Sequence, residues 1–379
     1  SNSKGIIGAL RYLENNGVNS VYFLPLNYGG DGCDTAPFIS DEANSFARTH
    51  YDLSKLHQWD QVLHFAQKRG VLLHFVLRET ESGNESLLGP INALTVQRKL
   101  FYRELVARFG SYYATKWNIS EESDLTDQAL IENKDYLRYL LPYNSPISFH
   151  THGVQDEYDQ NLNQTKLIMG SDLSFGETSI QYHNHDQASD IVEELSSLLP
   201  TTSISMDENG TPGAGVTNNN IDDMRKRLLY DVLFSGGQIE WYMGYHALPL
   251  GGDMRLEDFG TREQLWQQTA HARRFMESFL PFWEMEPADE LLTGESNQYG
   301  GGEVFAKRGS VYAIYLPDAS QEAVLDLSDG DGTFIAGYYN PRSGQFDSEI
   351  TSLPGGGYVT LPEPPDPAED WVILVAKRD

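Results

Sequence analysis

Strand-like and helix-like segments alternate along the first two thirds of the chain, and this alternation restricts the possible folds more than any other feature. Short runs rich in β-branched and aromatic residues are followed by amphipathic stretches, several of which stop at a glycine. Repeated units of this kind predict an α/β fold, and at about 250 residues a TIM-type (β/α)8 barrel. The predicted strands are 20–26, 71–77, 114–118, 147–150, 178–182, 203–206 and 238–242. The predicted helices are 5–16, 54–69, 95–109, 127–141, 187–199, 221–234 and 262–282.

The pattern supplies seven strands, and the chain opens on the helix that should follow a first strand. A closed barrel of this type needs eight strands. Either the first strand is missing from the sequence given, or one strand is hidden elsewhere in it. The α/β class is predicted in both cases, and the closure of the barrel is left open.

The pattern changes after Pro287. Short runs with alternating apolar and polar residues are separated by turns rich in Gly, Asp and Pro, which predicts an antiparallel β-sandwich. The sequence therefore predicts a barrel domain over 1–285 and a β-sandwich domain over 286–379. The run DLSDGDG (326–332) is similar to a calcium loop but lacks the closing glutamate, so a hairpin turn is favoured. The predicted strands of this domain are 303–307, 311–316, 323–327, 333–339 and 371–376.

Two carboxylate clusters each follow a predicted strand. Glu121 and Glu122 end the run WNISEE (117–122), and Asp207 and Glu208 end the run MDE (206–208). Because all strands of a parallel barrel end at one mouth, these clusters can face each other across a single cleft. One protonated and one ionised carboxyl group are the machinery of glycoside hydrolysis. The alternative is that the acids only cap the helices that follow their loops.

Composition excludes several kinds of partner. The 379 residues carry a formal net charge of −28, which disfavours nucleic acid, anionic membrane surfaces and densely sulfated or carboxylated polymers. No apolar run approaches the roughly 20 residues that span a bilayer. Cys33 is the single cysteine, so an intrachain disulfide is impossible. The opening Ser1-Asn2 looks like the remainder of a cleaved tag, so we expect a secreted or periplasmic protein whose signal peptide has been removed.

Several phrases resemble bacterial apiosidase-like or cellulase-like glycoside hydrolases with a barrel core. They are GIIGAL (5–10), GVNSVYFLP (17–25), GGDG (29–32), YDLSKL (51–56) and WNISEE (117–122). The tail, with YYNPRSG (338–344) and the late prolines 364–365, resembles the C-terminal domain that carries a collagen-binding name in those proteins. The resemblance implies a retaining mechanism, with the acid/base after the fourth strand and the nucleophile after the seventh. If the missing strand is the first, the run 114–118 is the fourth and 203–206 the seventh.

The resemblance also implies individual roles. Glu208 would be the nucleophile, with Asp207 beside it, and Glu122 the acid/base. In the wider clan an asparagine precedes the acid, whereas here Glu121 occupies that position, so the choice between Glu121 and Glu122 is open. Independently of the family, a proton donor near neutral pH needs burial or a second carboxylate to raise its pKa, and adjacent acids meet that need.

Other residues that follow predicted strands are candidate substrate contacts. The pair His150 and His152 has both rings on one face of a strand, so a metal site is the competing interpretation. Trp241 could stack on a sugar ring or pack in the core. The predicted substrate-binding residues are Asn27, Asp31, Asn118, His150, His152, Tyr182, His183, Asp207, Trp241 and Tyr245.

The favoured function is a retaining glycoside hydrolase that acts on a plant or algal polysaccharide or oligosaccharide by two carboxylates, without a cofactor or metal. One alternative is a metal-dependent barrel hydrolase that uses His150 and His152. The other is a carbohydrate-binding barrel without activity. Activity that survives a strong chelator would argue against the metal, and an alanine at Glu208 would separate an enzyme from a binding protein.

Overall fold

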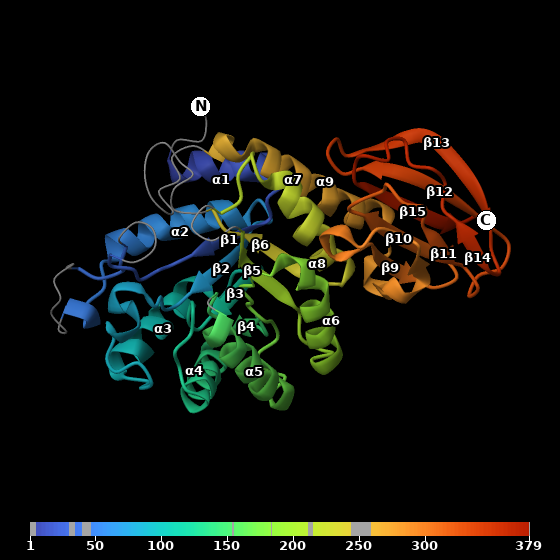
Figure 1. Cartoon of the computed structure of the whole chain (residues 1–379). Coiled ribbons are helices and arrows are strands. Elements are labelled where there is room, and N and C mark those ends of the chain that lie inside the picture. Colours follow the sequence, from blue (N-terminus) through green and yellow to red (C-terminus); the bar gives the residue numbers. More distant parts are fainter. Residues whose placement is uncertain are drawn as a thin grey trace. The chain divides into compact units, whose positions relative to one another are not determined.

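The computed structural model describes residues 5–29, 35–39, 47–153, 155–182, 184–210, 215–243 and 259–378 (Figure 1). By the contacts between its residues the chain forms two compact units. The first unit comprises Ser1–His183, Leu198–Gly215 and Glu240–Thr261, and the second comprises Asn184–Ser197, Val216–Ile239 and Arg262–Asp379. The domain boundary between 285 and 286 stays a prediction. No helix among the described residues is long and apolar enough to cross a membrane.

Parallel strands form the centre of the first unit. Four of them pair side by side in chain order: β1 (Ser20–Phe23), β2 (Leu72–Val76), β3 (Thr115–Asn118) and β4 (Ile147–Ser148). Residues 176–180 then take the place of a strand, because single parallel bridges join them to β4 on one side and to the run leading into β5 (Ser205–Asn209) on the other. Finally, β5 pairs with β6 (Gln238–Trp241). Six of the seven predicted strands are present in this series, and the predicted strand 178–182 is replaced by these single bridges.

Helices connect these strands and follow one another around their outside (Figure 1). They are α1 (Ile6–Asn15), α2 (Leu53–Gln67), α3 (Val96–Phe109), α4 (Asp127–Leu140) and α5 (Gln155–Ser171). Side-chain caps fix three of the starts, because Asp52, Thr95 and Thr126 accept hydrogen bonds from backbone N–H groups in the first turns of α2, α3 and α4. A helix over 155–171 was not predicted, and it is the main element of this unit that the sequence pattern missed.

The two faces of the strands differ in chemistry because side chains alternate along a strand. On β2 and β3, Phe75 and Trp117 stack with ring centres 4.5 Å apart, and Phe75 also stacks on Phe109 of α3. The alternate residues, His74 and Lys116, carry polar groups to the opposite face, where they are fully buried. Aromatic packing therefore attaches the helices to the strands, and the enclosed face is polar.

The closed eight-stranded barrel is not seen among the described residues. No ladder there joins β6 to β1, and no strand is described before α1. The two ends of the series are linked by side chains instead, since Ser20 on β1 donates a hydrogen bond to Glu240 on β6. The α/β class and the parallel order agree with the prediction.

The second unit contains helices and antiparallel sheets. Its long helices are α6 (Ala188–Leu198) and α9 (Glu263–Phe279). The predicted helix over 221–234 begins as α7 (Ile221–Met224), continues as a π-helical turn over Arg225–Leu229 and ends as α8 (Tyr230–Phe234). The π turn carries Arg225, which is buried and binds Asp370 through two nitrogens at 2.7 and 2.9 Å.

Two antiparallel sheets share one apolar core in this unit. The larger has the order β13 (Gln345–Pro354), β12 (Thr333–Asn340), β15 (Trp371–Lys377), β10 (Val311–Leu316), β9 (Glu303–Lys307) and β7 (Glu286–Pro287). The smaller has the order β14 (Tyr358–Thr360), β11 (Val324–Asp326) and β8 (Leu292–Thr293). The predicted antiparallel strands are confirmed, and β7, β8, β13 and β14 are additional to them. Residues 327–332, which the sequence analysis assigned to a turn, lie between β11 and β12.

Candidate active site

The two carboxylate clusters predicted from the sequence come together in the first unit. Glu121 follows β3, and Glu208 lies on β5. One carboxylate oxygen of each, together with a ring nitrogen of His150, all lie within 4.8 Å of one another. Residues more than eighty positions apart in sequence are thus adjacent at the ends of parallel strands, as the barrel pattern predicted.

The backbone is strained at two of these glutamates. Glu122 has φ of 36° and Glu208 has φ of 57°, and among the described residues Tyr299 is the only other non-glycine residue with positive φ. Such conformations are costly for residues with a side chain and are concentrated at functional sites. The strain at Glu122 is held by Thr80, whose hydroxyl lies 2.9 Å from the carbonyl oxygens of both Glu121 and Glu122.

Glu121 is held in its protonated form. Its residue surface is only 5% exposed, and burial raises the pKa of its carboxyl well above the ordinary value. The charges of Glu208 and Glu122 raise this pKa further, as do those of Glu81 and Glu79. A carboxyl group in these surroundings keeps its proton near neutral pH and can donate a hydrogen bond.

Glu122 has the opposite character. Its side chain is 24% exposed, and its carboxylate lies 3.6 Å from Nδ1 of His152. Burial raises the pKa of Glu122, but the hydrogen bond with His152, the electrostatic effects of His150 and His152 and the backbone N–H of Gly153 outweigh it and bring the pKa below its ordinary value. Burial lowers the pKa of His152, and its bonds to Glu122 and Asp124 outweigh that effect and raise it. Each group therefore favours the charged form of the other.

His150 is neutral and oriented by the backbone. Burial lowers its pKa to about 4. The backbone N–H of Glu122 lies 3.4 Å from Nδ1, which accepts this hydrogen bond, so the ring proton is on Nε2. That nitrogen lies 4.0 Å from a carboxylate oxygen of Glu208. His150 therefore presents an N–H group to the carboxylate of Glu208 and not a positive charge.

A buried ion network lies directly before Glu208 on β5. Asp207 has no exposed surface, and its carboxylate accepts hydrogen bonds from Lys116 at 2.8 Å and from Ser179 at 2.6 Å. Lys116 also contacts Glu177 at 2.7 Å. Burial raises the pKa of Asp207, but the charge of Lys116 outweighs it and holds the pKa well below its ordinary value. Asp207 is therefore ionised and fixed within the first unit, and a substrate contact by it stays a prediction.

Sequence reasoning missed several polar residues beside the carboxylates. His74 on β2 lies 2.7 Å from Glu240 on β6. Tyr22 on β1 is half-buried with its hydroxyl enclosed, and burial of that group together with the charges of Glu121 and Glu208 raises its pKa well above the ordinary value. No described residue gives its hydroxyl a hydrogen-bond partner. Each of these side chains occupies an alternate strand position, which is the signal that could have identified them.

The other predicted substrate contacts are distributed unevenly. Asn118 is fully buried and donates to Ser179 at 3.0 Å, while Asn27 is buried and accepts from Asn84 at 3.2 Å. Tyr182 is buried, and Trp241 is half-buried at the end of β6. These placements leave their role in binding a prediction. Three predicted contacts lie outside the described residues: Asp31, His183 and Tyr245.

The pair His150 and His152 does not form a common metal site. Among the described residues, the groups with three candidate ligand atoms in this unit are Glu121–His150–Glu208, Glu79–Glu81–Glu121 and His74–Asp207–Glu240, and none contains both histidines. His152 contacts Glu122 through Nδ1 and Asp124 through Nε2. The third group already binds the ammonium of Lys116, which opposes a second cation. The ligand set expected for a His-x-His metal site is therefore not assembled here.

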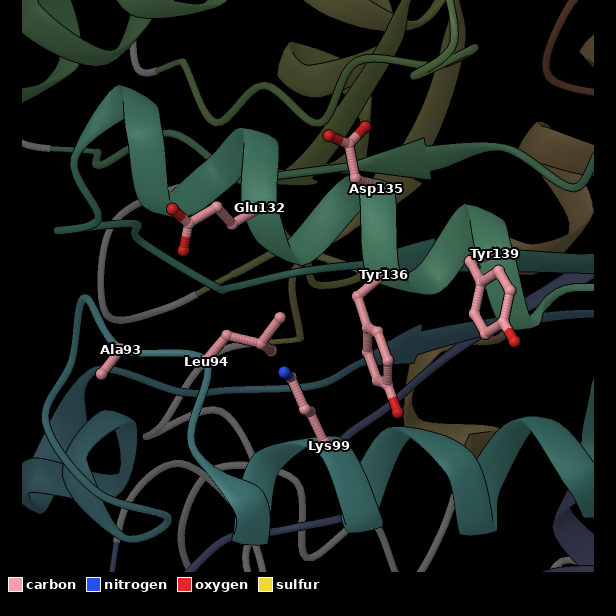
Figure 2. A pocket seen from close by; sticks show the side chains of 7 residues that line it. All are labelled: Ala93, Leu94, Lys99, Glu132, Asp135, Tyr136 and Tyr139. Atoms are coloured by element: carbon pink, nitrogen blue, oxygen red, sulfur yellow. The ribbon is translucent and has the colours of Figure 1, made fainter.

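A pocket of about 630 Å³ lies elsewhere, between helices α3 and α4 (Figure 2). Lys99, Tyr136 and Tyr139 line it, and the ammonium of Lys99 lies 5.6 Å from the centre of the Tyr136 ring. Neither Glu121 nor Glu208 lines this pocket, so we do not place the active site there.

Comparison with known proteins gives the same fold. No protein-family model matches the sequence, and no curated protein matches it. Among solved structures, the chain is similar to a protein titled "Glycoside hydrolase", with a TM-score of 0.75 and 15% identity over 98% of this chain and 88% of the other. A glycoside hydrolase family 5 protein from Bacteroides vulgatus ATCC 8482 matches with a TM-score of 0.72 and 16% identity over 98% and 84%. A GH30 endoxylanase from Clostridium papyrosolvens C71 matches with 0.53 and 11% over 100% and 94%. The chain therefore has the fold of these (β/α)8-barrel proteins.

Proposed function

We propose that the protein is a retaining glycoside hydrolase that cleaves a neutral polysaccharide or oligosaccharide of plant or algal origin. The observation that carries this proposal is the meeting of Glu121 and Glu208 at the ends of β3 and β5, with Glu122 next to Glu121 in the chain. Retaining enzymes need two carboxyl groups about 5 to 5.5 Å apart, and the nearest oxygens of Glu121 and Glu208 are within 4.8 Å, so this spacing is met by Glu121 and is not by itself an argument for Glu122. The fold shared with solved glycoside hydrolases supports the same reaction class.

We assign the nucleophile to Glu208 and the acid/base to Glu122. In the first step a carboxylate oxygen of Glu208 bonds to the anomeric carbon, while the bond to the leaving oxygen breaks and that oxygen takes a proton from Glu122. In the second step Glu122 removes a proton from water, the water oxygen bonds to the anomeric carbon, and Glu208 is released. The acid/base must exchange protons with water in each cycle, and Glu122 is more exposed than Glu121.

The proton on Glu122 is supplied through His152. In the free protein the pKa of Glu122 is below and that of His152 above the ordinary value, so the proton resides on the ring. A sugar bound over Glu122 would exclude water and favour the neutral pair, in which the carboxyl group carries the proton. Glu121, protonated and beside Glu208, would donate a hydrogen bond to a sugar hydroxyl or to the nucleophile.

The preference for a neutral sugar follows from charge. Glu79, Glu81, Glu121 and Glu208 lie close together, and the whole chain carries −28. A polymer with sulfate or carboxylate groups would be repelled from this region.

The roles are tested with three variants and two kinds of substrate. The protein is first screened on neutral plant and algal glycans, and the anomer of the first product is identified by NMR. Glu208→Gln should lower turnover by about 10⁴-fold or more on every substrate. Glu122→Gln should lower it by about 10²- to 10⁴-fold on glycans but far less in the glycosylation step of dinitrophenyl glycosides, whose leaving group needs no proton.

Glu121→Gln is the matched control, because it changes the adjacent residue and keeps a hydrogen-bond donor. It should lower both activities by a similar and smaller factor. If Glu121→Gln shows the leaving-group dependence and Glu122→Gln does not, the acid/base assignment is reversed. A first product of inverted configuration, or full activity in Glu208→Gln, would overturn the retaining mechanism. Glycan binding without any hydrolysis would favour the carbohydrate-binding barrel instead.

A further inference from the structure

A second group of carboxylates lies in the second unit and has no part in the proposed reaction. Glu193 belongs to α6, Asp289 opens the 3-10 turn Asp289–Leu291, and Glu303 opens β9. One oxygen from each of the three lies within 4.8 Å of the other two. Asp231 on α8 lies beside them, since its charge raises the pKa of Glu303 and the charge of Asp289 raises its own. These elements are labelled α6, α8 and β9 in Figure 1.

These acids are closely surrounded by protein. Glu303 is 4% exposed and Asp231 is 1% exposed. Burial raises the pKa of both well above the ordinary value, and burial together with Asp289 raises the pKa of Glu193 to about 7. A cation that acts on Asp231 is Arg227, but its guanidinium already binds Asp186 and Asp223. Glu303 and Asp289 hydrogen-bond to each other, Ser189 bonds to Glu303, and the backbone N–H of Val304 donates to Asp289 at 2.6 Å, so these two acids have polar partners but no cation among the described residues.

Asp231 gives an independent indication of a missing partner. Both of its carboxylate oxygens are buried, and apart from its own amide no described residue gives either oxygen a hydrogen-bond partner. A buried carboxylate without hydrogen bonds is strongly unfavourable, and buried charges are normally paired or bound to a metal. A partner that is not a side chain of the described residues is the simplest resolution.

A further oxygen atom lies near Asp231. Gly300 has φ of 100°, and a Cβ built there would lie 3.1 Å from the carbonyl oxygen of Asp186 and 3.5 Å from Oδ2 of Asp231. A carbonyl oxygen and a carboxylate oxygen thus border the same small space beside a residue that has no side chain. Carboxylates and backbone carbonyls are the ligands that calcium prefers.

We propose that Glu193, Asp289 and Glu303, with Asp231 beside them, bind one calcium ion. Calcium–oxygen distances of about 2.3 to 2.6 Å place ligand oxygens on opposite sides of the ion up to about 5 Å apart, which accommodates the observed separations. Zinc prefers nitrogen and sulfur ligands, and magnesium needs shorter bonds and keeps several waters. The ion would link α6 and α8 to Asp289 and to Glu303, which opens β9. Its role would be to stabilise the second unit. This assignment does not depend on the proposed hydrolase activity.

The test uses the full chain after removal of divalent ions with EDTA. Calcium is titrated by calorimetry, and thermal unfolding is followed with and without calcium. We expect one calcium per chain and, at about a hundredfold excess over the dissociation constant, a rise of about 5 °C in the unfolding temperature of the second unit. Asp231→Asn and Glu303→Gln should each weaken calcium binding by at least about tenfold, because ligand charge sets calcium affinity.

Two controls locate the ion. Glu194→Gln changes the exposed neighbour of Glu193 on the same helix, and Glu208→Gln changes the carboxylate group of the first unit; both should bind calcium as the unmodified chain does. Asp231→Asn and Glu303→Gln replace carboxyl groups whose ionised forms burial disfavours, so without calcium they should unfold at the same or a higher temperature, and failure to fold is not expected. No binding at millimolar calcium, equal binding of magnesium, or unchanged affinity in both variants would overturn the proposal.

Discussion

Replacing Lys116 by methionine should destabilise the first unit far more than the loss of an ordinary surface ion pair. Lys116 has a side chain that is 2% exposed, and it contacts Asp207 at 2.8 Å and Glu177 at 2.7 Å, which are 0% and 5% exposed. Methionine keeps much of the length of the aliphatic chain but leaves two carboxylates buried without their cation.

The size of the effect follows from two opposing terms. At an effective dielectric constant of about 20, unit charges 2.8 Å apart attract each other by about 6 kcal/mol. Burial of each ion costs several kcal/mol, and this cost remains for the carboxylates when the ammonium is removed. We therefore expect the free energy of unfolding of the first unit to fall by about 3 to 5 kcal/mol.

Urea unfolding of the full chain, followed by tryptophan fluorescence and far-UV circular dichroism, measures this change. Arg108→Met is the matched control, because Arg108 pairs with Glu104 at 2.6 Å on the surface of α3 and both side chains are about 30% exposed. That pair should contribute less than about 0.5 kcal/mol. Adding Asp207→Asn to Lys116→Met should recover part of the loss. If Lys116→Met costs no more than Arg108→Met, the buried network does not stabilise the fold as argued.

The same network has a predictable pH dependence. Lys116 holds the pKa of Asp207 well below its ordinary value although burial acts in the opposite direction. Because the pKa of Asp207 is lower in the folded chain than in the unfolded chain, its carboxylate stabilises the fold at pH values above the unfolded pKa of about 3.9. This stabilisation is lost as the pH falls from there toward the folded pKa. The difference in stability between the unmodified chain and Lys116→Met should therefore be full near neutral pH and narrow below about pH 4.

Three further predictions concern other contacts. Thr80→Val removes the hydroxyl that bonds to the carbonyl oxygens of Glu121 and the strained Glu122. It should lower the free energy of unfolding by about 1 to 2 kcal/mol and lower kcat more than it changes KM. Thr80→Ser should restore both the stability and kcat. The pKa of His152 is raised above its ordinary value of about 6.5, so the ring loses its charge, and the proton that it supplies, only at higher pH. Activity should therefore fall as the pH rises above about 6.5. His152→Asn should move this fall in activity to lower pH. Arg225→Met should lower the stability of the second unit by about 3 kcal/mol, measured by its urea midpoint, because Asp370 stays buried.

The strands and the meeting of Glu121 with Glu208 could be predicted because both depend on local patterns. Short apolar runs with flanking glycines identify strands, and parallel strands bring their ends together whatever their separation in sequence. The helix α5 could not be predicted in this way. Its sequence QDEYDQNLNQTKLIMGS is polar, and among its described side chains the buried ones are Asn161, Leu162, Thr165, Ile168 and Met169. Such a helix gains its stability from tertiary packing, which the sequence pattern does not express.

The ion network could not be predicted for a different reason. An alternating strand is normally interpreted as apolar on the buried face and polar toward solvent. On β2 and β3 both faces are buried, so His74 and Lys116 lie inside although their pattern is that of an exposed face. The partners of Lys116 come from residues 61 and 91 positions later in the chain, and only the fold specifies them.

The charge distribution of the first unit connects stability with the proposed chemistry. A glycosidic bond breaks through a transition state with positive charge on the sugar ring. Such a charge is stabilised by fixed negative groups in a site from which water is excluded. Lys116 neutralises part of the negative charge of Asp207 and Glu177. Glu208 lies instead beside Glu121 and His150. Removing Lys116 should therefore increase the negative field at Glu208, raise the pKa of nearby carboxyl groups and shift the pH profile of turnover toward higher pH, even in molecules that remain folded. A destabilised variant with an unshifted pH profile would separate the two effects and confine Lys116 to a structural role.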